Sequence, residues 1–176
     1  MAGGHITKTP TDSVYSGVVS IQGIRIVTFL SELNGLKLWS TDVGNAYLES
    51  VTEEKVCFIA GPEFGKLEGH TMVIHKAQYG LRSSGKRCHE KLHDILKDMG
   101  FTPSKSEEDI WMRPKGDHYE YIAVYVDDLM IASKEPEAII EALTGKHKLK
   151  LKGTGPTEFH LGCDYFRDDD GTLCVG

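Results

Sequence analysis

The chain has 176 residues, of which 40% are hydrophobic and 26% are charged, and its formal net charge is −6. These values are typical of a globular protein with one well-buried domain, or one domain with a smaller lobe. The acidic balance argues against a protein that wraps nucleic acid with a uniformly basic surface. The four cysteines are scattered without a CxxC pair, which argues against a zinc ribbon and against a disulfide framework.

The N-terminal segment MAGGHITKTPTDS has neither the basic region nor the apolar core of a signal peptide. No stretch approaches the roughly 20 consecutive apolar residues of a membrane-spanning helix. We therefore expect a soluble, intracellular protein that is not secreted and has no membrane partner.

The first half of the chain predicts two helices and several strands. Apolar residues at helical spacing predict a helix from Tyr15 to Asn34, which Gly35 ends. A strand at Lys37–Thr41 leads directly to Asp42. The remaining elements expected in this half are two strands and a helix, at Lys55–Ala60, His70–Lys76 and Lys86–Met99.

The second half is dominated by one apolar run, Tyr119–Ser133, whose β-branched and aromatic residues predict a buried hairpin. Around it we expect a short strand, a helix and three strand-like segments, at Ile110–Met112, Pro136–Leu143, Lys148–Lys152, Glu158–Phe166 and Thr172–Val175. Helices and strands interleave with adjacent hairpins, so an α+β domain is favoured over a parallel doubly wound sheet.

Two adjacent acids, Asp127 and Asp128, interrupt this apolar run. Ionised groups in a buried hairpin are costly unless they are paired or bound to a cation. Hard oxygen ligands on a tight turn suit Mg²⁺. The alternative is an ordinary turn that points both carboxylates into water, because aspartate favours turns.

Asp42 also follows a predicted strand beside a tight turn, so the three carboxylates could meet at one end of a shared sheet. Such a cluster would hold two metal ions about 3.5–4 Å apart, an arrangement that activates an attacking hydroxyl and stabilises a leaving pyrophosphate. Phosphoryl transfer depends mainly on this positioning and charge neutralisation.

A competing metal site is the segment His89-Glu90-Lys91-Leu92-His93, which matches the HExxH pattern of zinc metalloproteases on a predicted helix. The pattern is short, and the chain has eight histidines. A zinc protease also needs a third ligand. The candidates downstream are in a connector and a turn, at Glu107, Glu108 and His118.

Four ordered motifs resemble the reverse transcriptase of copia-type LTR retrotransposons, and together they cover nearly all of the chain. They are DVGNAYLE at Asp42–Glu49, the YGL loop with a basic helix at Tyr79–Lys91, YVDD at Tyr125–Asp128, and FHLGCDYFRDDDGTL at Phe159–Leu173. The resemblance implies an RNA-directed DNA polymerase, a nucleotidyltransferase with an antiparallel palm sheet packed on helices and with partial fingers.

The resemblance also implies catalytic roles. Asp42, Asp127 and Asp128 match the acids that bind Mg²⁺ or Mn²⁺, and the backbone of Val43 matches a further cation ligand. Lys152 resembles the lysine that protonates the pyrophosphate leaving group.

Other residues match positions that contact substrates. Tyr47 matches the aromatic gate that disfavours a 2′-hydroxyl, and Arg82 and Ser84 lie in the loop that contacts template and incoming dNTP. Tyr125 precedes the acid pair where template-primer contacts are made. The remaining four resemble the primer grip: Phe159, His160, Leu161 and Gly162.

The chain departs from the family pattern at Ser84-Gly85 and at Cys88, where a proline after the serine and an aromatic residue are usual. We interpret residues 1–176 as one palm and partial fingers domain, truncated at both ends. Its thumb, RNase H and integrase partners in a retrotransposon polyprotein or virus-like particle are absent. The expectation is therefore a polymerase fragment with reduced or no activity, and the alternative is a catalytically silent palm fold that binds partners.

Overall fold

The computed structural model describes residue 14 and residues 16–176, which fall into two compact units. The larger unit contains residues 17–44 and 93–176. The smaller unit contains residues 45–92 and the described residues that precede Gly17.

A six-stranded sheet forms the centre of the larger unit. All of its strand pairs are antiparallel, which confirms the predicted α+β class with an antiparallel sheet. Across the sheet the strands follow the order β4 (Thr102–Pro103), β5 (Ile110–Lys115), β6 (His118–Tyr125), β7 (Asp128–Ser133), β1 (Lys37–Val43) and β8 (Leu151–Pro156).

Helix α1 (Ile21–Leu33) packs on one face of this sheet. Its buried residues Ile24 and Val27 join Met130 and Ala132 of β7 in the core. The helix begins later than predicted: the backbone N–H of Val19 donates to the Val124 carbonyl of β6 at 2.9 Å, so this part of the chain is held by the sheet. Ser20 then caps the helix, and Tyr15, the predicted start, lies outside the described residues.

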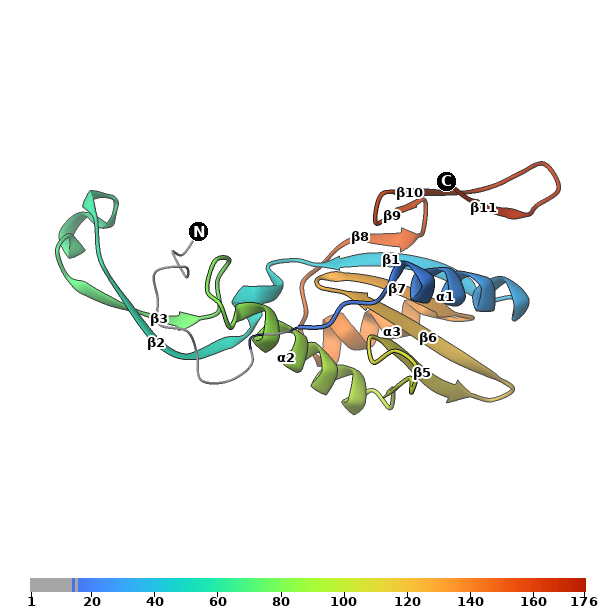
Figure 1. The fold of residues 1–176 in the computed structure, drawn as a ribbon, viewed down its shortest axis with the longest axis horizontal. Coiled ribbons are helices and arrows are strands. Elements are labelled where there is room, and N and C mark those ends of the chain that lie inside the picture. Colours follow the sequence, from blue (N-terminus) through green and yellow to red (C-terminus); the bar gives the residue numbers. More distant parts are fainter. Residues whose placement is uncertain (1–13, 15) are drawn as a thin grey trace. The chain divides into compact units, whose positions relative to one another are not determined.

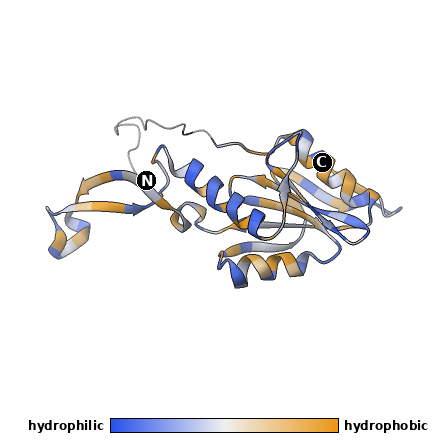
Figure 2. Ribbon diagram, turned by 90° about the horizontal axis from the view of Figure 1, so that it is seen from below, coloured by the Kyte–Doolittle hydropathy of each residue, from blue (hydrophilic) through white to orange (hydrophobic). Residues whose placement is uncertain are grey.

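Helix α3 (Pro136–Glu141) and α1 lie on opposite sides of the sheet (Figure 1, Figure 2). A π-turn at Ala142–Lys146 extends α3, and its buried residues Ile139 and Leu143 complete the core on that side. Hydrophobic residues run along the strands between the two helices (Figure 2).

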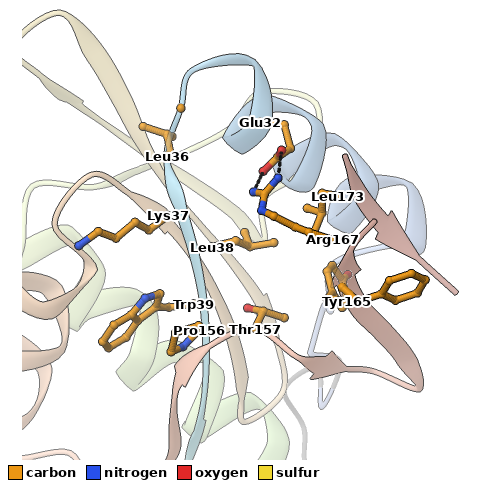
Figure 3. Close-up of a pocket in the computed structure, with 12 residues that line it drawn as sticks. Glu32, Leu36, Lys37, Leu38, Trp39, Pro156, Thr157, Tyr165, Arg167 and Leu173 are labelled. Atoms are coloured by element: carbon orange, nitrogen blue, oxygen red, sulfur yellow. Dashed lines mark hydrogen bonds and ion pairs between the residues drawn. The ribbon is translucent and has the colours of Figure 1, made fainter. Parts of the chain in front are cut away.

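The C-terminal segment forms a small three-stranded sheet from β9 (Phe159–His160), β10 (Cys163–Arg167) and β11 (Leu173–Val175). Arg167 holds it to α1 through a forked ion pair with Glu32, with N–O distances of 2.6 and 2.9 Å. Beside this pair is a cavity of about 500 Å³, and Trp39, Leu38 and Tyr165 line it (Figure 3).

The smaller unit is built on a ribbon of two antiparallel strands, β2 (Val51–Ile59) and β3 (Thr71–Lys76). A 3₁₀ helix precedes each strand: η2 (Ala46–Glu49) comes before β2, and η3 (Pro62–Leu67) lies between β2 and β3. Helix α2 (Ser84–Asp98), predicted within two residues of its bounds, continues from this unit into the larger one. No helix of the described residues is long and apolar enough to span a membrane.

Candidate active site

Asp42 occupies a central position near the end of β1, between two neighbouring strands. It lies directly opposite Asp128 on β7 and opposite Lys152 on β8. Residues paired in this way project from the same face, with their Cβ atoms about 4.5–5.5 Å apart. Asp128, Asp42 and Lys152 therefore form a row of residues across three strands.

Asp127 lies in the two-residue turn that joins β6 to β7. The first turn residue, Val126, has a φ of 57°, and the second has a negative φ, which is the pattern of a type II′ turn. Glycine is usual at the first position, and a left-handed conformation costs a residue with a side chain about 1–2 kcal/mol. The Asp127 carbonyl accepts a hydrogen bond from the backbone N–H of Val43 at 2.7 Å, which ties the turn to the end of β1.

The three carboxylates affect one another electrostatically. Partial burial raises the pKa of Asp42 above its usual value, repulsion from Asp127 raises it further, and the ammonium group of Lys152 lowers it. Burial likewise raises the pKa of Asp128, with added repulsion from Asp127 and Asp42. Binding of a proton or a cation would relieve the repulsion among these partly buried carboxylates.

Strand β8, which carries Lys152, is held to β1 by more than its backbone ladder. The hydroxyl groups of Thr41 and Thr154 are 2.7 Å apart, and Thr41 also donates to the Lys152 carbonyl at 3.2 Å. The N–H of Gly44 donates to the Lys150 carbonyl at 2.7 Å. Sequence reasoning did not identify Thr41, Gly44 or the strained Val126, because their importance depends on which strands become neighbours.

The residues predicted to contact the primer also belong to the larger unit. Tyr125 is the last residue of β6 and pairs with Asp128. The predicted primer grip, Phe159–Gly162, forms strand β9 and the tight turn that joins it to β10. The two turn residues, Leu161 and Gly162, have φ angles of 49° and 85°, the signature of a type I′ turn. Phe159 is exposed, whereas His160 is buried and burial lowers its pKa.

Tyr47, Arg82 and Ser84 belong to the smaller unit. Tyr47 is in η2, and its ring meets that of Tyr79 edge-on with centroids 4.3 Å apart. Ser84 is buried, and its hydroxyl accepts a hydrogen bond from the Gln78 N–H at 3.0 Å. Arg82 is exposed in the same loop. Their contacts with nucleotide stay predictions.

Several residues of the alternative zinc site have partners inside the larger unit. His93 Nε2 lies 3.4 Å from Asp109 Oδ1, and the ring packs edge-on against Trp111. Glu107, a suggested third ligand, binds the backbone N–H and hydroxyl of Ser20 at the start of α1. His118, another, contacts Asp117 at 2.9 Å. These contacts give the suggested ligands Glu107 and His118 structural partners.

Comparison with known proteins identifies the family of the chain. A family model described as reverse transcriptase (RNA-dependent DNA polymerase) matches residues 4–175. The chain is 26% identical over 160 residues to the retrovirus-related Pol polyprotein from transposon RE1 of Arabidopsis thaliana, which covers 89% of this chain and 11% of that protein. The polyprotein from transposon RE2 of the same plant matches at the same identity and coverage.

A yeast relative gives a consistent result. The chain is 28% identical over 137 residues to the putative transposon Ty5-1 protein of Saccharomyces cerevisiae, covering 76% of this chain and 44% of that protein. The chain thus spans about a tenth of the plant polyproteins and less than half of the yeast protein. Because the family model matches nearly all of its residues, the chain belongs to the reverse transcriptase (RNA-dependent DNA polymerase) family, in its copia-type retrotransposon branch.

Proposed function

We propose that the larger unit is a polymerase palm, which transfers a deoxynucleotide to a primer 3′-hydroxyl on an RNA template. The observation that carries this proposal is the direct opposition of Asp42 and Asp128 on neighbouring strands, with the Asp127 turn tied to Val43. In a chain of the reverse transcriptase family, this cluster would supply the acids that nucleotidyl transfer needs.

The three carboxylates fit a divalent cation, Mg²⁺ or Mn²⁺. They supply hard oxygen donors, and the raised pKa values of Asp42 and Asp128 reflect a negative charge that a cation would neutralise. The backbone of Val43 is a further candidate ligand. When bound, the cations would lower the pKa of the primer hydroxyl and neutralise charge on the leaving pyrophosphate.

The chain's own side chains would have separate roles around this centre. Lys152, in line with Asp42, would donate a proton from Nζ to the leaving pyrophosphate. The exposed Phe159 and the rest of its hairpin, His160, Leu161 and Gly162, would hold the primer end together with Tyr125.

We further propose that the smaller unit is the partial fingers. The ring of Tyr47, positioned by Tyr79, would exclude a ribose 2′-hydroxyl. Arg82 and Ser84, in the loop before and at the start of α2, would lie against template and incoming dNTP. Residues 1–176 would then form one functional domain despite their two compact units.

The protein's natural setting would be a retrotransposon polyprotein with thumb, RNase H and integrase segments, inside the cell or in virus-like particles. Phosphate neutralisation provides much of the affinity for nucleic acid. Since the net charge of this chain is −6, we expect it to bind template-primer weakly by itself, with low activity.

Primer extension on poly(rA)/oligo(dT) with Mg²⁺ tests the proposal. We expect the wild-type chain to incorporate dTTP. The rate of incorporation by Asp128→Asn should be lower by more than about 100-fold, since the proposed metal centre supplies several kcal/mol of charge stabilisation. Asp117→Asn, at the opposite end of β6, is the matched control and should retain wild-type incorporation. Equal incorporation by wild type and Asp128→Asn would contradict the assigned chemistry, and no incorporation by any variant would favour a silent palm fold that binds partners.

A further inference from the structure

Gly44 lies immediately beyond β1, two residues after Asp42. It is buried, and the side chain of Lys152 lies against it. A Cβ atom added to Gly44 would lie 2.8 Å from Lys152 Cε and 3.3 Å from Lys152 Cδ. Real Cβ contacts are not found at 2.8 Å, so the aliphatic part of Lys152 occupies the space that a side chain at position 44 would need.

We propose that Gly44 is a positioning residue for Lys152, an inference that deepens the proposed polymerase function and rests on it for its catalytic meaning. The lack of a side chain lets the lysine stem lie across the end of β1, within the range at which the ammonium charge acts on Asp42. The geometry of the two strands supports this, because Lys152 pairs with Asp42 and its charge acts on that carboxylate.

Replacing Gly44 with alanine should displace the lysine and leave the fold intact. Gly44 does not have a left-handed φ, so alanine can adopt its backbone conformation. The clashing atom, Cε, is near the tip of a flexible and exposed side chain, which can turn into solvent at little cost. The Lys150 carbonyl, 3.1 Å from the added Cβ, must yield by only a few tenths of an ångström.

Gly155 offers a matched control on the same strand as Lys152. It pairs with Ser40 of β1, and a Cβ atom added there would meet no atom within 4 Å among the described residues. Gly155→Ala therefore makes the same chemical change on β8 without touching the lysine.

The placement of Lys152 can be measured without polymerase activity, by zero-length carbodiimide cross-linking of the full chain followed by peptide mass spectrometry. We expect an amide between Lys152 and Asp42 in the wild type and in Gly155→Ala, and a yield lower by about fivefold or more in Gly44→Ala, since cross-linking depends on proximity. The ion pair of Lys37 and Glu137, 3.2 Å apart, is the internal reference. Equal yields in all three proteins, or no such amide in the wild type, would overturn the proposal.

A double-mutant cycle then tests the catalytic meaning. If Gly44 acts through the lysine, Gly44→Ala lowers the rate of incorporation about tenfold in the wild-type background and has no effect in Lys152→Met. Equal losses in both backgrounds would show that Gly44 acts by another route and would overturn the positioning role. If the wild type does not polymerise, the proposed function fails, while the cross-linking result still decides where Gly44 places the lysine. Melting temperatures within about 4 °C of wild type would show that the variants are folded.

Discussion

Asp42 and Asp128 lie directly opposite each other on β1 and β7, so one cross-strand pair of the sheet carries two negative charges. Like charges in such a pair destabilise a sheet, and burial adds to the cost. The cation site proposed above would give this costly pair a role.

Asp128→Asn should stabilise the protein in the absence of divalent metal. The change removes a charge that partial burial disfavours and that Asp127 and Asp42 repel. Because solvent screens these partly exposed charges, we expect the free energy of unfolding in urea to rise by only about 0.5–1 kcal/mol. Millimolar Mg²⁺ should stabilise the wild type and leave the variant unchanged, because ligand binding to the folded state adds stability.

The control for this prediction is Asp117→Asn. The pKa of Asp117 is lowered to about 2 by hydrogen bonds from His118 and Lys134, so this carboxylate favours the folded state near neutral pH. Its removal should lower stability, if only slightly. A loss of stability in Asp128→Asn like that in Asp117→Asn would contradict the idea of a strained acid cluster.

The stability gap between Asp128→Asn and the wild type should depend on pH. Because the pKa of Asp128 is raised in the folded state, the folded protein takes up the proton more readily than the unfolded chain. The wild type therefore regains stability as pH falls through the raised pKa, and the gap should close near the unfolded value of about 3.9. Urea unfolding of both proteins from pH 7.5 down to pH 4, without divalent metal, measures this. A gap that stays constant with pH would show that the pKa of Asp128 is not raised in the folded state.

Val126→Gly should be nearly neutral for stability, although it removes a β-branched residue. Glycine relieves the backbone strain of a φ of 57°, which is worth about 1–2 kcal/mol. It also costs about 0.5–1 kcal/mol in backbone entropy on folding and removes the apolar area that the valine side chain buries. The same change at Val124, which is 1% exposed on β6, should cost about 3 kcal/mol. Chemical denaturation of the two variants compares a strained turn position with an unstrained core position, and losses of similar size would refute the strain.

Gly162→Ala should destabilise the C-terminal hairpin. Gly162 has a φ of 85° in its turn, where alanine costs about 1–2 kcal/mol. Gly145, in the π-turn after α3, has no left-handed φ and no atom within 4 Å of an added Cβ among the described residues, so Gly145→Ala should add about 0.4–1 kcal/mol. Thermal unfolding of both variants should shift in opposite directions, and a shift in the same direction would contradict the turn assignment.

Arg113→Met should be strongly destabilising, because it leaves Glu120 charged inside the sheet. Glu120 is 2% exposed, and it accepts hydrogen bonds from Arg113 Nε at 2.9 Å and from the Ser133 hydroxyl at 2.7 Å. Removing one partner of a buried pair costs about 3–5 kcal/mol. Adding Glu120→Gln to Arg113→Met should restore part of this stability in urea unfolding, since no buried charge then remains unpaired. A double variant no better than Arg113→Met would show that the loss comes from packing.

Much of the local structure is predictable from the residue pattern. The apolar periodicity identifies α2 and the strand before Asp42, and the β-branched run identifies the β6–β7 hairpin. The start of α1 could not be predicted in this way, because Val19 is held by a hydrogen bond to Val124, more than 100 positions along the chain. Periodicity reports which face of a segment is apolar, and it contains no information about a distant strand that competes for its backbone.

The sequence alone determined that two adjacent acids interrupt a buried hairpin and that a third acid follows a strand, because residue type and spacing are local properties. Only the tertiary structure decided that β1 lies between β7 and β8, which places Asp42 opposite both Asp128 and Lys152. It also placed the Lys152 stem over Gly44 and made Val126 adopt a left-handed conformation. These relationships depend on strand order and register, which arise when separate apolar faces bury one another and which no single segment encodes.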